Sequence, residues 1–336
     1  MQDVKISIII AMRNEEKYIA QCIDSLLNSN YDKEKMEIII IDSMSEDGSK
    51  EIVEQYMIKH ENIKCYSNIN IYTPFAFNIG IRNAMGTYIF IVSAHSKYDK
   101  DYFSVLTKYA IKLKADTIGA VSKTGVINNT TKANSIKSVL SNKFGVGNSY
   151  FRTGTDKIIE VDAISGCYHR DVFKKYGLYN EKLIRNQDIE LNKRIKNGGG
   201  KLYLIPYTSY TYFVRETFSL LSKNNYSNGL WNMLTAYYTK TFTSLSLRHF
   251  IPLLFVLSLV FPLLVLIFIP KAIWISILSL GSYLVLVIII SLKLKNKKNS
   301  FHYIFISFFV LHLSYGIGSL VGIFSVLKQI IKGENE

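Results

Sequence analysis

Three long apolar stretches near the C-terminus constrain the fold of this chain more than any other feature. Residues 251–269 and 272–292 contain no charged residue, and each has the length of about 20 residues that a helix needs to cross the hydrocarbon core of a bilayer. Residues 303–327 form a third stretch, in which Gly316, Gly318 and Gly322 are candidate close-packing or kink positions. The sequence therefore predicts a transmembrane region over 251–331 with two to three helices.

The charge pattern predicts how this region is oriented. The net charge is +14, and Lys293, Lys295, Lys297 and Lys298 follow the second apolar stretch. Positive loops favour the cytoplasmic side, and the N-terminus enters a strand without a secretory signal. We therefore expect a multi-pass protein of the cell membrane with a cytoplasmic N-terminal domain. The third stretch either crosses or re-enters, and both alternatives are open.

Charge and cysteine usage narrow the possible partners. The positive charge accompanies no RNA-binding signature and no zinc-finger spacing, so we expect membrane contact and no nucleic acid. Cys22, Cys65 and Cys167 lie far apart without metal-ligand spacing. This pattern indicates buried free thiols in a reducing compartment.

The first hundred residues alternate between strand-like and helix-like patterns. Apolar runs at 5–11, 36–42 and 87–93 are typical of buried strands, and apolar residues at helical spacing recur over 16–29 and 49–60. Strands that alternate with helices predict a parallel sheet and a doubly wound, Rossmann-like α/β fold.

The remaining boundaries follow from composition. We expect the α/β domain over 1–213, with a polar surface loop at 122–135, and an amphipathic helical linker over 214–250. The linker is rich in aromatic residues, among them Trp231, Tyr237 and Tyr238. These aromatics either lie in the lipid interface or pack against the α/β domain, and the sequence does not choose between the two.

Polar residues follow the predicted strands, where the ligands of open α/β sheets bind. They are Arg13, Asn14 and Glu15 after the first strand, Asp42, Ser45 and Asp47 after the second, and Ser93 and His95 after the strand at 87–93. Acids, an arginine and an imidazole suit a ribose diol, a base edge and a diphosphate. Each group alone also fits a helix cap or a turn. No GxGxxG motif or P-loop follows the first strand, so neither a dinucleotide cofactor nor a P-loop nucleotide site is predicted.

A second set of polar residues lies in "NQDIELNKRIKNGGG", residues 186–200. The spacing predicts a helix with Asp188 in its first turn and Arg194 near its end, stopped by the glycines. Asp188 is either a capping residue or, if it faces a cleft, a base that takes a proton from an attacking hydroxyl.

Four segments together resemble a known family. They are "SIIIAMRNEEKYIAQCIDSLL", "EIIIIDSMSEDGSKEIV", "FAFNIGIRNAMGTYIFIVSAHSKY" and "RNQDIELNKRIKNGG". In this order and spacing they resemble the family 2 glycosyltransferases, which have a GT-A fold, and in particular the membrane-anchored, succinoglycan-type enzymes of bacterial surface polysaccharide synthesis. The resemblance spans residues 4 to 232.

The resemblance implies roles for individual residues. Arg13, Glu15 and Asp42 match positions that hold the ribose and base of a donor nucleotide, and Asn78 and Arg82 match a helix that lines its diphosphate. Asp188 matches the general base. On the acceptor side lie Arg194, Asn224 and Trp231.

Ser93-Ala94-His95 takes the place of the family's Asp-x-Asp motif, which binds a divalent cation, Mn²⁺ or Mg²⁺. Serine here replaces the first acid. Three alternatives are open: His95 ligates a metal together with phosphates, water and a carboxylate from elsewhere; a protonated His95 contacts phosphate directly; or donor turnover is lost.

The resemblance thus predicts an inverting glycosyltransferase that moves a sugar from a nucleotide donor, such as a UDP-sugar, to a lipid-linked saccharide. The serine motivates a rival of another class, a catalytically silent subunit of a membrane polysaccharide-assembly complex. A nucleotidyltransferase is disfavoured because "AMRNEEK" has no glycine-rich phosphate loop.

Overall fold

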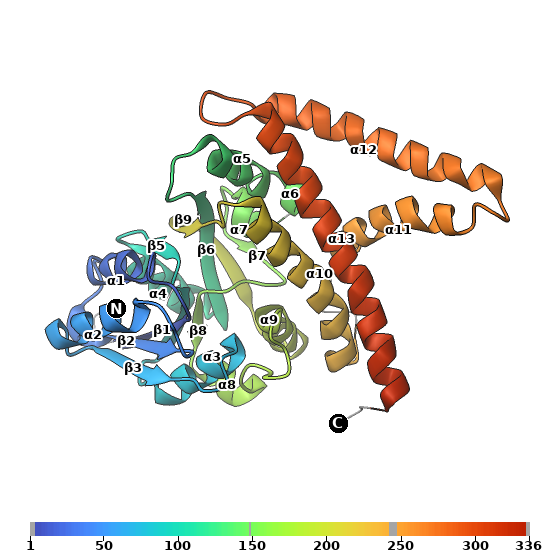
Figure 1. The fold of residues 1–336 in the computed structure, drawn as a ribbon. Coiled ribbons are helices and arrows are strands. Elements are labelled where there is room, and N and C mark those ends of the chain that lie inside the picture. Colours follow the sequence, from blue (N-terminus) through green and yellow to red (C-terminus); the bar gives the residue numbers. More distant parts are fainter. Residues whose placement is uncertain (1–3, 148, 242–246, 334–336) are drawn as a thin grey trace. The chain divides into compact units, whose positions relative to one another are not determined.

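The computed structural model describes residues 4–147, 149–241 and 247–333, in two compact units (Figure 1). The α/β unit comprises Met1–Thr124 and Tyr150–Phe213. The helical unit comprises Gly125–Ser149 and Val214–Glu336. Residues 242–246 of the predicted linker lie outside the described residues.

The α/β unit is built on one mixed sheet with the strand order β3-β2-β1-β4-β8-β6-β9-β5, and β7 pairs with β9. The strands are β1 (Ile6–Met12), β2 (Met36–Asp42), β3 (Ile63–Ser67), β4 (Tyr88–Ser93), β5 (Ser96–Tyr98), β6 (Thr117–Gly125), β7 (Ile159–Glu160), β8 (Cys167–His169) and β9 (Leu202–Phe213). The first four strands are parallel, as predicted, whereas β8 runs antiparallel to β4. The Rossmann-type part of the prediction is therefore confirmed, and the sheet as a whole is mixed.

Helices cover both faces of the sheet because β1, β2 and β4 are almost wholly apolar, and side chains that alternate along a strand face opposite sides. The helices are α1 (Ile19–Leu27), α2 (Ser49–Lys59), α3 (Thr73–Asn83), α4 (Tyr102–Leu113), α7 (Tyr150–Thr153), α8 (Asp171–Tyr176) and α9 (Gln187–Asn197), with a 3₁₀ turn at Lys33–Lys35. Ile8 and Ile10 pack with α1, α2 and α4, and Ile9 packs with α3, α8 and α9.

The register of the parallel strands decides where their polar ends lie. Met12 of β1 is paired with Asp42 of β2, and Ala11 is paired with Ser93 of β4. The carboxyl ends of these strands therefore lie at one edge of the sheet, which positions the residues that follow them close together.

The helical unit contains α5 (Thr131–Leu140), α6 (Lys143–Val146), α10 (Phe218–Thr239), α11 (Ile251–Leu264), α12 (Ile273–Leu294) and α13 (Phe301–Lys332), with 3₁₀ turns at Leu247–His249 and Pro270–Ala272. The prediction of a surface loop over 122–135 was wrong at both ends of that range. Strand β6 extends to Gly125, and α5 starts at Thr131, where the Thr130 side chain accepts a hydrogen bond from the Ala133 N–H and caps the helix. A polar composition concealed a capped helix.

Helices α10 and α13 pack side by side at close range (Figure 1). A Cβ at Gly229 would collide with the Tyr315 carbonyl oxygen, and one at Gly318 with the Tyr226 carbonyl oxygen. The glycines of α13 are therefore close-packing positions in a continuous helix. The linker aromatics belong to a helix, α10, that packs on the third apolar segment.

Within the described residues, three helices are long and apolar enough to cross a membrane: Leu247–Leu264, Pro270–Leu294 and Phe301–Lys332. Helix α11 ends at Leu264, before the end of its apolar stretch, and a turn leads into α12 so that the two form a hairpin (Figure 1). At a rise of 1.5 Å per residue, α12 is about 33 Å long, enough to span the hydrocarbon core.

Candidate active site

Glu15 and His95 meet at the carboxyl edge of the sheet. Glu15 follows β1, and His95 lies in the turn between β4 and β5. Glu15 Oε1 lies 2.9 Å from His95 Nδ1, and the two side chains are only 8% and 16% exposed. A carboxylate bonded to Nδ1 fixes the orientation of the ring and favours the tautomer with the proton on Nδ1. The pair is therefore a preorganised polar element at the strand ends.

Asp42 joins the loop after β2 to the loop after β1. The buried Asp42 carboxylate accepts a hydrogen bond from the Ser45 N–H at 3.2 Å, and Ser45 Oγ accepts one from the Asn14 N–H at 3.0 Å. Asn14 has a φ of 53°, a left-handed conformation that asparagine tolerates better than most residues. The two loops therefore hold Glu15 and Asp42 in one network.

The same network secures the start of the Glu15 segment. The Glu15 N–H donates to Ser49 Oγ at 2.7 Å, and the Glu16 N–H donates to Asp47 Oδ2 at 3.2 Å. Arg13 is exposed in this loop. The strand-end residues predicted after β1, β2 and β4 thus lie together at one edge.

Helix α3 carries the two residues assigned to the donor diphosphate, Asn78 and Arg82, and the two side chains lie in different surroundings. Asn78 is buried, and its amide group bonds Tyr179 N, Tyr179 O and Glu181 Oε1 at 2.8–3.0 Å. Arg82 is exposed in the last turn. Just after that turn, the Gly86 N–H bonds Ser7 Oγ near the start of β1. Asn78 therefore braces a loop, and Arg82 lies toward the amino edge of the sheet, away from the strand-end cluster.

The residues around Ser93 do not fit a divalent cation held by protein ligands alone. Ser93 offers a neutral hydroxyl, and the Ser93 N–H donates to the Tyr98 hydroxyl at 2.8 Å. Divalent cations of the Mg²⁺ and Mn²⁺ type prefer several oxygen ligands, carboxylates above all. Among the described residues, no group of three His, Cys, Asp or Glu side chains is arranged to hold a metal.

Asp188 lies in the first turn of α9, and its carboxyl is partly accessible but closely surrounded by protein. The Ile189 N–H donates to Asp188 Oδ1 at 2.9 Å. Burial nevertheless prevails over this bond and raises the pKa of Asp188 above its ordinary value of 3.8. A carboxyl with such a pKa is the kind of group that can accept a proton during catalysis.

Asn192 ties the start of α9 to the carboxyl end of β4. The Asn192 side chain donates to the carbonyl oxygens of Asp188 and Ile164, at 2.7 and 2.8 Å. The segment after Ile164 pairs with β4, where the Ile91 N–H donates to Gly166 O at 2.8 Å. Asp188 therefore lies toward the carboxyl edge of the sheet, the edge at which the Glu15–His95 pair lies.

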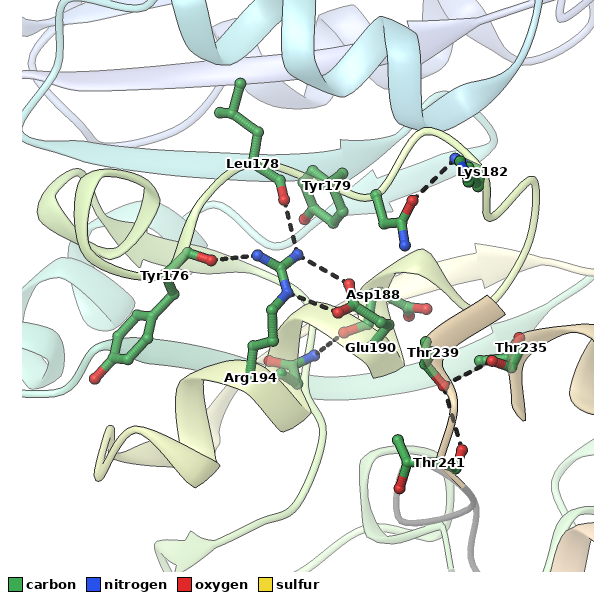
Figure 2. Close-up of polar contacts among 12 residues, drawn as sticks. Tyr176, Leu178, Tyr179, Lys182, Asp188, Glu190, Arg194, Thr235, Thr239 and Thr241 are labelled. Carbon is green, nitrogen blue, oxygen red and sulfur yellow. Dashed lines mark hydrogen bonds and ion pairs between the residues drawn. The ribbon is translucent and has the colours of Figure 1, made fainter. Parts of the chain in front are cut away.

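The guanidinium of Arg194 is hydrogen-bonded to other residues of the α/β unit (Figure 2). It bonds both oxygens of Glu190, at 2.6 and 2.9 Å, and the carbonyl oxygens of Tyr176 and Leu178. These contacts pin the turn after α8 against α9. We interpret Arg194 as a residue that positions Asp188's helix.

Asn224 and Trp231, the other residues predicted for the acceptor side, both lie on α10 of the helical unit. Asn224 is exposed, and the Trp231 ring stacks on Tyr238 with ring centroids 6.4 Å apart. Their role toward the acceptor stays a prediction.

Arg152 is a site candidate that the sequence analysis did not select. Its guanidinium carbon lies 5.6 Å from the ring centroid of Tyr212, and that ring lies 4.8 Å from the ring of His95. Arg152 is the one charged residue in the stretch 144–155. This isolation was the available signal, but only the fold brings α7 beside β9.

Comparisons with known proteins agree with this geometry. The family model described as Glycosyl transferase family 2 matches residues 7–177. A dolichyl N-acetyl-α-D-glucosaminyl phosphate 3-β-D-2,3-diacetamido-2,3-dideoxy-β-D-glucuronosyltransferase of Methanococcus voltae is 32% identical over 67% of this chain and 71% of its own. The succinoglycan biosynthesis protein ExoA of Rhizobium meliloti is 26% identical over 62% of this chain. The chain spans 63% of ExoA, slightly less than two thirds.

Solved structures show the same fold at low sequence identity. The mannosyltransferase PcManGT of Pyrobaculum calidifontis, in complex with GDP-Man and Mn²⁺, has a TM-score of 0.60 at 14% identity and covers 94% of this chain and 87% of its own. Residues 1–349 of S. aureus TarS have a TM-score of 0.52 at 15% identity, covering 98% and 92%. Because the family model matches half of the residues and coincides with the strand-end cluster, this chain belongs to glycosyl transferase family 2.

Proposed function

We propose that this glycosyltransferase moves a sugar from a nucleoside-diphosphate sugar to a lipid-linked saccharide, with inversion at the anomeric carbon. Asp188 takes the proton of the acceptor hydroxyl, and the hydroxyl oxygen forms a bond to the anomeric carbon. The bond from that carbon to the diphosphate oxygen breaks, and its electron pair leaves with the nucleoside diphosphate. The observation that carries the proposal is the position of Asp188, with its raised pKa, toward the carboxyl edge of the sheet where the Glu15–His95 pair lies.

The donor occupies the carboxyl edge of the sheet. Asp42 and Glu15 suit the hydroxyls of a ribose and the edge of a base, and Arg13 suits an anionic group. His95, held by Glu15, faces the diphosphate. A UDP-sugar is the donor we propose, and the neighbouring structure of TarS with UDP-GlcNAc supports that class.

The proposed steps are assigned to this chain's own residues, and no step is assigned to a divalent cation. A structural neighbour contains Mn²⁺ together with its nucleotide sugar, but Ser93 removes a carboxylate from the position that the resemblance assigns to the metal. Chelation therefore becomes part of the test of the donor site.

The acceptor is proposed to be lipid-linked, which explains why a catalytic unit carries membrane-length helices. The Methanococcus relative is named for a dolichyl-linked amino-sugar phosphate. Asn224 and Trp231 are the residues we propose for the acceptor side, because they lie on the helix that connects the catalytic unit to those apolar helices.

The catalytic unit is proposed to face the cytoplasm, with α11 and α12 as two crossings. This arrangement returns the chain to the cytoplasm at the lysine-rich segment around Lys297. Helix α13 packs along α10, which follows the catalytic unit directly and has buried Asn225 and Asn232, and its first half also packs against α11 and α12. We propose that α13 re-enters and ends on the cytoplasmic side. Its C-terminal Lys328 then also obeys the positive-inside rule.

The test compares Asp188→Asn with Asp171→Asn, an exposed control on α8. With a donor and lipid-linked acceptor that the wild type uses, Asp188→Asn should lower kcat by about 10²–10⁴-fold, the usual contribution of a general base. Asp171→Asn should stay near wild type. Transfer by a folded Asp188→Asn variant at the wild-type rate would contradict the role of Asp188.

NMR of the product tests inversion, because an α-configured donor should give a β-linked product. Retention of configuration would contradict the mechanism. A folded wild type that neither binds nucleotide sugars at millimolar concentration nor transfers sugar would favour the silent-subunit alternative.

A further inference from the structure

We propose that Arg152 is a binding residue for the donor diphosphate and supplies positive charge that the serine-substituted motif no longer recruits through a metal. The proposal rests on the proposed function and deepens it, because it names the group that neutralises the leaving diphosphate. Its basis is the juxtaposition of Arg152, Tyr212 and His95 in the α/β unit.

Arg152 and His95 both lie beside the ring of Tyr212. The ring of Tyr212 contacts the ring of His95, with centroids 4.8 Å apart, and the Arg152 guanidinium carbon lies 5.6 Å from the Tyr212 centroid. Strand β9 fixes Tyr212 through its pairing with Ser96, the residue after His95. A second contact of the same strand, from the Phe213 N–H to the His95 carbonyl oxygen at 3.1 Å, holds the turn. Arg152 therefore stands beside the strand end where the diphosphate is proposed to bind.

Tyr210 places Arg152 near Asp188 as well. Burial raises the pKa of Tyr210; the charge of Asp188 raises it further, whereas the charge of Arg152 opposes the rise. Both charges are thus close enough to act on one hydroxyl.

Among the residues that the structure describes, no acidic side chain pairs with the guanidinium of Arg152. It lies 5.4 Å from the Phe151 ring centroid in addition to its contact with Tyr212. No carboxylate of the described chain forms an ion pair with it, whereas Arg194 of the same unit is bonded to Glu190. Arg152 is half-buried, and a half-buried cation is costly unless an anion compensates it.

The chemistry of the expected anion matches these surroundings. A guanidinium presents a planar fork of N–H donors that binds phosphate oxygens in pairs, and its charge does not depend on pH in the working range. A diphosphate gains negative charge as the sugar departs, so a fixed cation stabilises the transition state more than the ground state. Stacking on Tyr212 orients the fork without consuming its hydrogen bonds. Arg152 can therefore perform the electrostatic task for which the Asp-x-Asp motif recruits a cation.

The experiment measures the binding of UDP and of uridine to the full chain in detergent, with EDTA and with added Mn²⁺. The variants are Arg152→Gln, which removes the charge and keeps a planar amide, and Arg152→Lys, which keeps the charge and loses the fork. Lys174→Ala on α8 is the surface-cation control. Thermal unfolding of each variant monitors the fold.

We expect Arg152→Gln to weaken UDP binding by about 10–100-fold in EDTA, the loss of a charge-assisted contact. Uridine, which has no phosphate, should bind as it does to wild type. Arg152→Lys should lose less affinity for UDP than Arg152→Gln, and Lys174→Ala should match wild type.

Two outcomes would overturn the inference: unchanged UDP affinity in Arg152→Gln, whether or not binding depends on Mn²⁺, or equal losses for UDP and uridine, which indicate a structural role. A folded wild type that does not bind UDP, with or without Mn²⁺, overturns the proposed function together with this inference. Normal UDP binding in both wild type and Arg152→Gln overturns this inference alone.

Discussion

The Glu15 carboxylate meets His95 Nδ1 at 2.9 Å across 80 residues of sequence. Both side chains leave the same edge of the sheet, one after β1 and the other after β4, because Ala11 and Ser93 are paired in register. The rings of Tyr18 and Tyr212 flank the imidazole, at centroid distances of 6.0 and 4.8 Å. The imidazole is thus confined by a carboxylate and two aromatic rings.

This confinement predicts that Glu15 acts on the donor partly through His95. Glu15→Ala removes the carboxylate that orients the ring, and we expect a loss of about 10–100-fold in UDP affinity, the range found for partners that orient metal-ligating histidines. His95→Ala should lose at least as much, and the double variant should lose less than the product of the two single losses. Isothermal titration calorimetry measures these affinities.

Glu51→Ala, an exposed carboxylate on α2, is the matched control and should bind UDP normally. Losses that add up in the double variant would show that Glu15 and His95 act independently, against this interpretation.

Asp188 predicts a pH dependence of both rate and stability. Its pKa is raised by burial, so the ionised base is lost as pH falls through a value above the ordinary 3.8. We expect the acidic limb of kcat/KM to lie above that value in wild type. Stability changes in the opposite direction with pH. A raised pKa in the folded state means that folding favours the protonated carboxyl. The stability that Asp188 contributes is therefore fully present below pH 3.8 and is lost as pH rises through the raised pKa.

Thermal unfolding of Asp188→Asn and wild type as a function of pH checks the predicted pH dependence of stability. The variant, which cannot ionise, should be more stable at pH 7, and its advantage should shrink as pH falls toward 4. A constant difference across this range would contradict a raised pKa. Asp171→Asn should show no such gain.

The strands and the strand-end residues were predictable because each depends on local pattern. Runs such as Ile6–Met12 cannot be solvated as loops, and their carboxyl ends converge whenever the strands are parallel. The chemistry of Asp42 and His95 followed from their places at those ends. The spacing predicted Asp188 in the first turn of a helix. The family resemblance, which the matching family model confirms, added the role of general base, and that role stays a prediction.

The parts that escaped prediction depend on partners distant in sequence. Arginine is a residue type that often binds ligands, yet the guanidinium of Arg194 is hydrogen-bonded to Glu190 and to two backbone carbonyl oxygens. Arg152 carries no motif and gains its interest from Tyr212, which only the mixed part of the sheet brings beside it. The capped helix α5 was hidden because polar residues on its surface resemble those of a loop.

The close approach of α10 and α13 predicts a stability effect that depends on one methyl group. A Cβ at Gly318 would meet the Tyr226 carbonyl, whereas a Cβ at Gly281 on α12 would meet no atom within 4 Å. Gly318→Ala should lower the free energy of unfolding by about 1–3 kcal/mol, the cost of overpacking. Gly281→Ala should be neutral or stabilising by up to about 1 kcal/mol through helix propensity. Thermal unfolding in detergent measures both, and equal effects would contradict backbone-to-backbone packing.

The proposed topology predicts which lysines face the cytoplasm. Lys297 lies in the loop between α12 and α13, Lys271 in the turn between α11 and α12, and Lys328 near the end of α13. Two crossings by α11 and α12 place Lys271 on the outer side. Packing of α13 along α10 keeps Lys328 on the same side as Lys297, with the catalytic unit. Cysteines at the three positions should therefore react differently with a membrane-impermeant maleimide.

In inside-out vesicles, we expect Lys297→Cys and Lys328→Cys to be labelled and Lys271→Cys to be protected; sealed right-side-out vesicles should give the opposite pattern. The wild-type chain, with buried Cys22 and Cys167 and half-buried Cys65, gives the background. Labelling of Lys328→Cys from the outer side would make α13 a third crossing. It would also require α10 to leave the cytoplasmic face with α13, because Gly229 and Gly318 do not allow the two helices to separate without losing their backbone contact.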